Sequence, residues 1–245
     1  MKNTTIIAKI GGKIIENPQN LKNTLNQLKT LLLDKEIIEN IIIIPGGGSY
    51  ANFIRKLDAK LEIGDELSHW MAIFAMNCNG IMICQKYNEI RCISDISELK
   101  KSNKTISIFL PFDFLYQSDK LPHNWSVTSD SIAIYIASIL ELNQCFLIKD
   151  VDGIFIKNQK EPIQDISPKD YEKLKNDSKL VKFENQFEAI KKSKPIDLYS
   201  LKLINDFKIS CIILNGSFNS KRISSYFDET ISEKEKIFTR IIDRI

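Results

Sequence analysis

The stretch that decides the fold is Trp125–Phe155, WSVTSDSIAIYIASILELNQCFLIKDVDGIF. Its first half predicts a helix, because Thr128 or Ser129 can cap an N-terminus with a side-chain hydroxyl. Apolar residues then recur at helical spacing and make one buried face: Ile132, Ala133, Ile136, Ala137, Ile139 and Leu140. After Asn143 the run CFLI is typical of a strand buried on both faces. A helix that leads into a buried strand indicates an α/β protein.

Polar residues lie at the N-terminus of the predicted helix and at the carboxyl end of the predicted strand. Asp130 lies in the first turn of the predicted helix, where the helix dipole favours a carboxylate. The strand delivers four further residues to its carboxyl end, which is where open α/β sheets bind ligands: Lys149, Asp150, Asp152 and Gly153. The stretch therefore predicts one half of an active site.

A glycine pair follows the first predicted strand, Thr4–Ile10. Gly11 and Gly12 let the backbone approach a ligand and turn its amides inward, as phosphate-binding loops do. Lys9 stands just before them, so its ammonium group can reach the same phosphate. A plain strand-to-helix turn explains the pair equally well, and the GxxxxGK[ST] spacing of a Walker loop is absent.

Three glycines follow the second predicted strand, Ile41–Ile44. A turn needs only one or two, so Gly46, Gly47 and Gly48 favour a backbone nest for an anion, with a helix N-terminus behind it. Arg55 lies about two turns into that helix. It either grips a phosphate or carboxylate with its guanidinium group or is a solvated surface arginine.

The rest of the chain alternates helical and strand-like patterns. Helices are predicted over Asn20–Leu33, Leu67–Gly80, Lys182–Lys194 and Ile196–Asp206, and strands over Ile81–Cys84, Ile106–Leu110 and Ile209–Leu214. Leu110–Trp125 is interpreted as a long aromatic loop, which is often functional, and Lys157–Lys182 as charged linker. The alternation implies a mainly parallel sheet with helices on both faces.

Length and composition narrow the class of protein. The 245 residues are 43% apolar and 27% charged, which is ordinary for a soluble globular protein. A net charge of +3 without a Lys/Arg block does not favour a nucleic-acid partner. We find no run of about 18 apolar residues, so no membrane span is expected. These properties predict a cytoplasmic protein without nucleic-acid or membrane partners.

The cysteines and histidines predict neither a disulfide nor a metal centre. Five cysteines without a CxxC pair are expected to be reduced thiols in an intracellular protein: Cys78, Cys84, Cys92, Cys145 and Cys211. The two histidines and the scattered cysteines lack metal-ligand spacing, so no structural zinc and no metal-ligating side chains are predicted.

Five motifs occur together in one order: AKIGGKII, IPGGGSYANFIR, VTSDSIAIYIA, LIKDVDGIF and ILNGS. As an ordered set they resemble the amino acid kinase family, which includes acetylglutamate, uridylate and isopentenyl phosphate kinases. The resemblance implies a single three-layer αβα sandwich over residues 1–245, with the acceptor held by the N-terminal half and ATP by the C-terminal half. It also implies catalysis by alignment and charge neutralisation, without a covalent intermediate.

The resemblance assigns roles to the residues that match these motifs. Three residues would be catalytic: Lys9, Asp130 and Lys149. Lys9 would stabilise the transferring phosphoryl group, and Asp130 would orient the catalytic lysine or the acceptor end. ATP would meet Gly11, Gly12, Lys149, Asp150, Asp152 and Gly153, and the acceptor would meet Gly46, Gly47 and Gly48. Many members have a second catalytic lysine in the C-terminal half, for which Lys182, Lys191 and Lys192 are candidates. Lys13 replaces the usual serine of the first loop, and Phe238-Thr239 replaces a common Gly-Thr near the C-terminus.

The segments HWMAIFAM, PHNW and WSVTSDSIA resemble one branch of the family in particular. That branch includes the kinase that converts (aminomethyl)furanmethyl phosphate to its diphosphate in methanofuran biosynthesis. The resemblance implies ATP and Mg²⁺, a phosphate monoester held by Arg55 and the three glycines, a pocket closed by Trp125, and a homodimer or dimer-based oligomer. Two alternatives stay open. One is another acceptor, such as an amino-acid carboxylate, UMP or an isoprenoid phosphate, and the other is a non-catalytic nucleotide-binding or storage protein.

Overall fold

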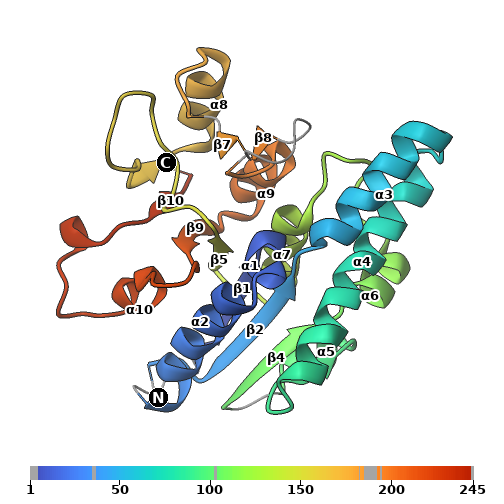
Figure 1. Ribbon diagram of the computed structural model, residues 1–245, viewed down its shortest axis with the longest axis horizontal. Helices are drawn as coiled ribbons and strands as arrows, with labels where there is room; N and C mark the ends of the chain where they lie inside the picture. The colour runs from blue at the N-terminus through green and yellow to red at the C-terminus, as the bar shows by residue number, and fades with distance from the viewer. Residues whose placement is uncertain are drawn as a thin grey trace.

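An eight-stranded sheet forms the centre of the protein, in the order β3-β4-β2-β1-β5-β9-β10-β6 (Figure 1). The computed structural model describes residues 5–34, 37–101, 104–181, 183–184, 192–193 and 195–243. The strands of the sheet are β1 Thr5–Ile10, β2 Asn40–Pro45, β3 Arg91–Ile93, β4 Thr105–Phe109, β5 Gln144–Lys149, β6 Asp165–Ile166, β9 Ser210–Asn215 and β10 Thr239–Ile241.

The sheet is mainly parallel, as predicted. Strands β3, β4, β2, β1, β5 and β9 all run in one direction, whereas β10 is antiparallel to β9. Strands from the first half of the chain lie on one side of the sheet and strands from the second half on the other. The two sides meet where β1 pairs with β5, in a register that places Lys9 opposite Leu147 and Ile10 opposite Ile148.

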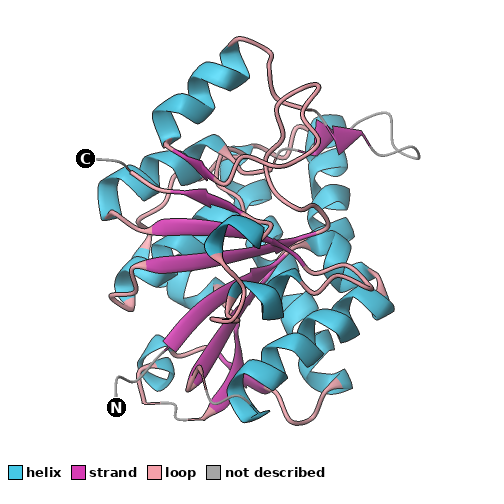
Figure 2. Ribbon diagram, turned by 90° about the vertical axis from the view of Figure 1, so that its left-hand side faces the viewer, coloured by secondary structure: helices cyan, strands magenta, loops and turns pink. Residues whose placement is uncertain are grey.

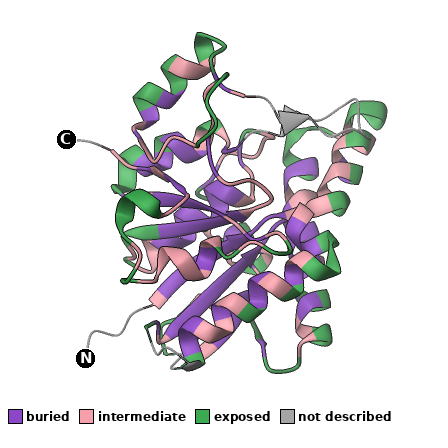
Figure 3. Cartoon of the chain, turned by 60° about the vertical axis from the view of Figure 1, so that its left-hand side comes forward, coloured by how far each residue is buried: buried purple, intermediate pink, exposed green. Residues whose placement is uncertain are grey.

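Helices cover both faces of the sheet and complete the predicted three-layer αβα arrangement (Figure 2). Apolar residues of α1 Gly12–Glu16, α2 Pro18–Lys29 and α10 Arg222–Tyr226 form one buried cluster with one face of the sheet. The opposite cluster contains residues of α6 Phe112–Ser118, α7 Ser129–Ile139, α8 Pro168–Asn176 and α9 Leu198–Phe207. Figure 3 shows the strands buried between these layers. Remaining elements are α3 Gly48–Leu61, α4 Asp65–Lys86, α5 Ile96–Leu99, the π-helix Thr30–Asp34 and the 3₁₀ turn Glu233–Glu235.

Helix α7 begins where the sequence predicts. Thr128 is the N-cap, and its side chain accepts a hydrogen bond from the backbone N–H of Asp130. Burial extends further round the helix than one face, because every residue from Asp130 to Ala137 is buried. Helix α7 lies between the sheet and α9, so it meets protein on two sides. Such an all-round apolar helix belongs to the core.

Three sequence expectations about local structure are wrong. Ile81–Cys84 forms the last part of α4 and not a strand, because a short apolar run fits either element and the helix continues through Gly80. A side chain at Gly80 would collide with Leu110 and Ile108, so the glycine serves close packing there. Leu110–Trp125 contains helix α6, and Lys157–Lys182 contains β6 and α8.

Most of the helix predicted over Lys182–Lys194 lies outside the described residues. Its described parts are strands β7 Phe183–Glu184 and β8 Lys192–Ser193, which pair antiparallel and contradict a helix at those positions. Lys182 and Lys191 lie outside the described residues.

The expectation that all cysteines are reduced is wrong for two of them. Cys84 and Cys92 form a disulfide that joins the end of α4 to β3. Cys145 and Cys211 are buried free thiols, as expected, and Cys78 is a half-buried free thiol. The pairing requires the end of α4 to lie beside β3. It was not expected from the sequence, because Ile81–Cys84 is predicted there to be a strand and not the end of a helix.

Helix α4 is long and apolar enough, by length and composition alone, to cross a membrane. This differs from the expectation that no such stretch exists. Half of the apolar stretch is buried in the fold, where α4 packs on α3, α6, β2 and β4. Core helices of soluble proteins pass the same test, so the finding is weak evidence for a membrane.

Candidate active site

Two lysines and one aspartate meet at the carboxyl ends of β1 and β5. The Lys9 Nζ lies 2.8 Å from the Asp130 Oδ1, and the Lys149 Nζ lies 2.6 Å from the Asp130 Oδ2. Lys9 is the penultimate residue of β1, Lys149 is the last residue of β5, and Asp130 comes from the first turn of α7, which packs across both strands. We refer to these three side chains as the charge cluster.

The charge cluster is nearly closed to solvent, since its side chains are 7%, 6% and 12% exposed for Lys9, Asp130 and Lys149. Burial alone would raise the pKa of Asp130, but the charges of Lys149 and Lys9 outweigh it and lower that pKa to about 2. Burial lowers the pKa of Lys9, although Asp130 opposes the shift. Two ammonium groups at a sheet edge can neutralise the charge of a phosphoryl group during transfer.

The two glycine loops lie against each other beside the charge cluster. The Gly11 N–H donates to the Ile148 carbonyl at 2.9 Å, and the Gly46 N–H donates to the Ile10 carbonyl at 2.8 Å. A Cβ on Gly12 would lie 2.4 Å from the Gly48 Cα, so the loops can touch only without side chains. Gly48 also has a φ of +55°, which favours glycine. These contacts bring together loops that the sequence assigns to different ligands.

Replacing Gly12 with alanine is expected to destabilise the fold by about 1–3 kcal/mol, because a backbone-to-backbone clash must be relieved. The change is also expected to displace the Gly48 loop, to which the family resemblance assigns the acceptor, and so to raise the KM of that acceptor. Urea unfolding and steady-state kinetics measure the two effects. Lys56→Ala on the exposed surface of α3 is the control and should change stability by less than about 0.5 kcal/mol. An unchanged stability in Gly12→Ala would contradict the tight loop contact.

The loop after β5 is held by basic and amide groups. The Asp150 Oδ2 lies 2.9 Å from the Lys13 Nζ, so Lys13 pairs with a carboxylate and does not simply face solvent. The Asp152 Oδ1 accepts from the Arg222 Nε at 3.0 Å and from the Asn215 Nδ2 at 3.3 Å. Sequence reasoning did not select Arg222 or Asn215. Asn215 ends a buried strand at the same sheet edge, and that position was a signal which could have found it.

Gly153 has a φ of +146° and lies against Thr239, whose Oγ1 would lie 2.4 Å from an added Cβ. The Thr239 hydroxyl accepts from the Ile154 N–H at 2.8 Å and donates to the Ile163 carbonyl at 2.6 Å. Thr239 therefore packs against Gly153 and stabilises the loop after β5. It does so although the residue before Thr239 is Phe238 and not the glycine common in the family.

Arg55, from α3, contacts Trp125, from the segment before α7. The Arg55 guanidinium carbon lies 4.3 Å from the centre of a Trp125 ring, and the Trp125 Nε1 donates to the Asp58 Oδ2 at 2.7 Å. Arg55 is half-buried, and burial lowers its pKa. It is therefore not a freely solvated surface arginine. The pair clamps the segment before α7 onto α3.

A model of the amino acid kinase family matches residues 4–215. The chain belongs to the amino acid kinase family. Over 238 residues this kinase is 30% identical to [5-(aminomethyl)furan-3-yl]methyl phosphate kinase from Methanocaldococcus jannaschii, and the match covers 96% of this chain and 97% of that relative. Family and relative together make the chain a phosphotransferase.

Solved structures share the fold of this kinase. Uridylate kinase from Archaeoglobus fulgidus has a TM-score of 0.63 at 14% identity, with 97% of this chain and 99% of that chain covered. UMP kinase from Ureaplasma parvum has a TM-score of 0.66 at 17% identity, with 99% and 100% covered. At such identities the likeness establishes the αβα fold alone.

The second lysine of the charge cluster is Lys149, which the sequence placed in both a catalytic and an ATP-binding role. Of the other candidates, Lys182 and Lys191 lie outside the described residues and Lys192 is described only as part of β8. Within the described ranges, no three His, Cys, Asp or Glu side chains gather as a metal site.

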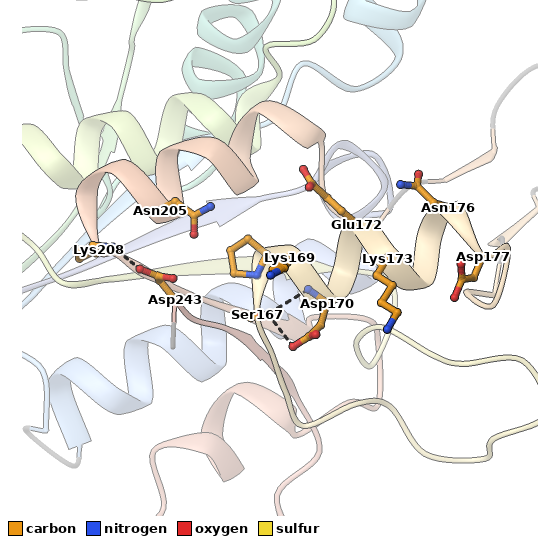
Figure 4. A pocket seen from close by; sticks show the side chains of 11 residues that line it. Ser167, Lys169, Asp170, Glu172, Lys173, Asn176, Asp177, Asn205, Lys208 and Asp243 are labelled. Atoms are coloured by element: carbon orange, nitrogen blue, oxygen red, sulfur yellow. Dashed lines mark hydrogen bonds and ion pairs between the residues drawn. The ribbon is translucent and has the colours of Figure 1, made fainter. Parts of the chain in front are cut away.

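A pocket on the far side of this kinase is separate from the charge cluster (Figure 4). It is lined by α8, by the end of α9 at Lys208 and by Asp243, and so lies at the end of β9 opposite to Asn215. Its lining carries both signs of charge, and Lys208 already pairs with Asp243. Nothing there selects a ligand of one charge.

Proposed function

We propose that this kinase transfers the γ-phosphoryl group of ATP to a phosphate monoester, [5-(aminomethyl)furan-3-yl]methyl phosphate, and forms its diphosphate. The choice of acceptor rests on the 30% identity to [5-(aminomethyl)furan-3-yl]methyl phosphate kinase, which extends along nearly the whole of both chains. The charge cluster beside two glycine loops supports the phosphoryl-transfer chemistry. The proposal places the reaction in the biosynthesis of a methanofuran-type cofactor.

The reaction requires two highly charged phosphates to approach each other. An oxygen of the acceptor phosphate attacks the γ-phosphorus, the bond from that phosphorus to the β-phosphate oxygen breaks, and ADP leaves with that oxygen. Lys9 and Lys149 lie where they can offset the negative charge of both partners, and Asp130 binds both ammonium groups. The acceptor lies against Gly46, Gly47 and Gly48, and the nucleotide lies along the loop from Lys149 to Gly153.

Mg²⁺ is expected to arrive on the phosphates of ATP, since Mg²⁺ is usually held by one or two carboxylates together with substrate phosphates. The acids at this edge are each already paired with a cation: Asp130 with two lysines, Asp150 with Lys13 and Asp152 with Arg222. The described residues thus offer no ready cage for the ion. We therefore assign Mg²⁺ no ligand from the protein and no step in the proposed reaction.

An acceptor panel tests the proposal. Purified protein is incubated with ATP and Mg²⁺ and with the aminomethylfuran phosphate, UMP, isopentenyl phosphate or N-acetylglutamate, and ADP release is followed with product mass. The expected result is the highest kcat/KM for the aminomethylfuran phosphate, by at least about tenfold, or about 1.4 kcal/mol. A clear preference for UMP or another acceptor would replace the proposed substrate. No transfer to any of them would overturn the proposal.

Trp125→Ala is expected to raise the acceptor KM about tenfold, because it releases Arg55 and the segment before α7 and removes a large contact surface. The KM of ATP should stay within about twofold of the wild-type value if Trp125 belongs to the acceptor side. Steady-state kinetics with each substrate varied in turn separates the two constants. Trp70→Ala is the comparison variant, since Trp70 packs in the aromatic group with Phe112 and Tyr116. Equal effects on both KM values would contradict an acceptor role for Trp125.

Three wider expectations belong to the same proposal. The N-terminal half binds the acceptor and the C-terminal half binds ATP, within one domain over residues 1–245. The protein works in the cytoplasm. It forms a homodimer or a dimer-based assembly, which sedimentation velocity would test.

A further inference from the structure

Asp197 joins the N-termini of two helices. It is the N-cap of α9, where its Oδ1 accepts from the Ser200 N–H at 2.6 Å. The same carboxylate reaches the start of α7: the Thr128 hydroxyl donates to its Oδ2 at 2.6 Å, and the Ser131 hydroxyl donates to its Oδ1 at 2.7 Å. The Ser131 N–H adds a longer contact to Oδ2 at 3.3 Å. Four donors therefore converge on one carboxylate.

The residue between these two anchors is Asp130. The Thr128 Oγ1 accepts from the Asp130 N–H at 3.2 Å while the Thr128 hydroxyl donates to Asp197. Ser131, the next residue, is fully buried and is bound to Asp197 through both its side chain and its backbone. Asp197 thus fixes Thr128 and Ser131, which lie on either side of Asp130 in the sequence, and Asp130 in turn binds Lys9 and Lys149.

The arrangement is favourable for electrostatic reasons. The N-termini of α7 and α9 both present orphan N–H groups and the positive end of a helix dipole to the carboxylate. The negative charge of Asp197 also acts on Lys9, since it is one of the influences that raise the pKa of that lysine against the effect of burial. The carboxylate is therefore both a mechanical and an electrostatic support for the charge cluster.

We propose that Asp197 is a positioning residue for phosphoryl transfer, which sets the place of the Asp130 carboxylate through Thr128 and Ser131 without touching either substrate. The inference rests on the proposed function for its kinetic readout. It adds to that function the N-cap of α9, an element that contributes no side chain to the charge cluster, and this residue lies more than 45 positions beyond Lys149 in the sequence.

Two substitutions separate positioning from simple helix capping. Asparagine still accepts from the Ser200 N–H and keeps the α9 cap, but its NH₂ group cannot accept from Thr128. We expect Asp197→Asn to lower kcat about tenfold and Asp197→Ala about 100-fold, with the KM of both substrates within about threefold, because small misplacements act mainly on the transition state. Asp95→Ala is the matched control, since Asp95 caps α5 by accepting from the Ser97 N–H at 2.8 Å and lies outside the site. It should leave kcat unchanged.

A double-mutant cycle tests the path through Thr128. Thr128→Val removes the hydroxyl, and Thr128→Ser should recover most of the kcat that valine loses. If Asp197 acts through this hydroxyl, the double variant Asp197→Asn with Thr128→Val should lose little more than the worse single variant. Multiplied losses would show independent roles and overturn the path.

Crystal structures of the wild type and Asp197→Ala give a readout that needs no acceptor. The expected result is that Asp130 moves out of hydrogen-bond distance of at least one of its two lysines in the variant. Unchanged geometry together with an unchanged kcat in the folded variant would overturn the inference. If the wild type transfers phosphate to no acceptor, the proposed function fails while the crystallographic comparison still decides the role of Asp197.

Discussion

Lys9→Met is expected to lower kcat by about 1,000-fold, while the protein remains folded. A preorganised cation that meets developing charge in a closed site contributes about 10²–10³ in rate or more. Methionine keeps most of the length of the side chain and needs no counter-ion, and Lys149 continues to neutralise Asp130. The free energy of unfolding should therefore change by no more than about 1–2 kcal/mol.

Steady-state kinetics and urea unfolding on the same preparation measure both effects of this substitution. Lys29→Met is the control, because Lys29 lies on α2 and pairs with Glu89 away from the sheet edge. It should keep wild-type kcat. A Lys9→Met enzyme with more than about one tenth of the wild-type kcat would remove Lys9 from the catalytic role.

Asp130→Asn is expected to reduce both activity and stability. The change leaves two nearly buried ammonium groups beside each other without their shared carboxylate, and breaking a buried pair costs about 3–5 kcal/mol. Lys9, whose pKa is already lowered by burial, is expected to lose its proton more readily. With the cations displaced or neutralised, kcat should fall by about 10²–10³.

The stability difference between wild type and Asp130→Asn should depend on pH. The pKa of Asp130 is lowered from 3.8 to about 2 in the folded protein, so its ionised form stabilises the fold above about pH 4. That contribution is lost as the pH falls from about 4 towards about 2. Urea unfolding at pH 7 and at pH 3 should therefore show a smaller difference at the lower pH. Asp170→Asn, which changes an exposed first-turn acid of α8, is the control and should show little difference at either pH. An equal difference in unfolding free energy between wild type and Asp130→Asn at pH 7 and pH 3 would contradict a stabilising role for the ionised Asp130.

The elements that position the site could be predicted because their patterns are local. The strand CFLI, the glycines after two apolar strands and the hydroxyl cap before Asp130 each depend on a few neighbouring residues. All of them lie where the sequence indicates. Parallel strands bring their carboxyl ends to one edge, so the predicted fold class placed Lys9 and Lys149 at that edge. Their meeting at Asp130 depends on the pairing of β1 with β5, which only the structure shows.

Other features depend on contacts between distant residues, which no local pattern contains. Asp197 resembles an ordinary helix cap in sequence, and only the packing of α9 on α7 gives it four donors. The disulfide at Cys84 requires α4 to continue past Gly80 and lie beside β3. Arg222 reaches Asp152 from α10, across 70 positions of the chain.

The join between β1 and β5 has a consequence for how the enzyme can be divided. Lys9 belongs to a fragment that ends before α7, whereas Asp130 and Lys149 belong to the remainder. Given the roles proposed for these residues, neither piece is expected to carry the reaction alone. A break near the exposed Asp119, between α6 and α7, would leave each piece with its own strands of the sheet. Mixing two such inactive polypeptides should restore turnover only when they dock edge to edge. Recovered turnover would then act as a reporter of strand complementation.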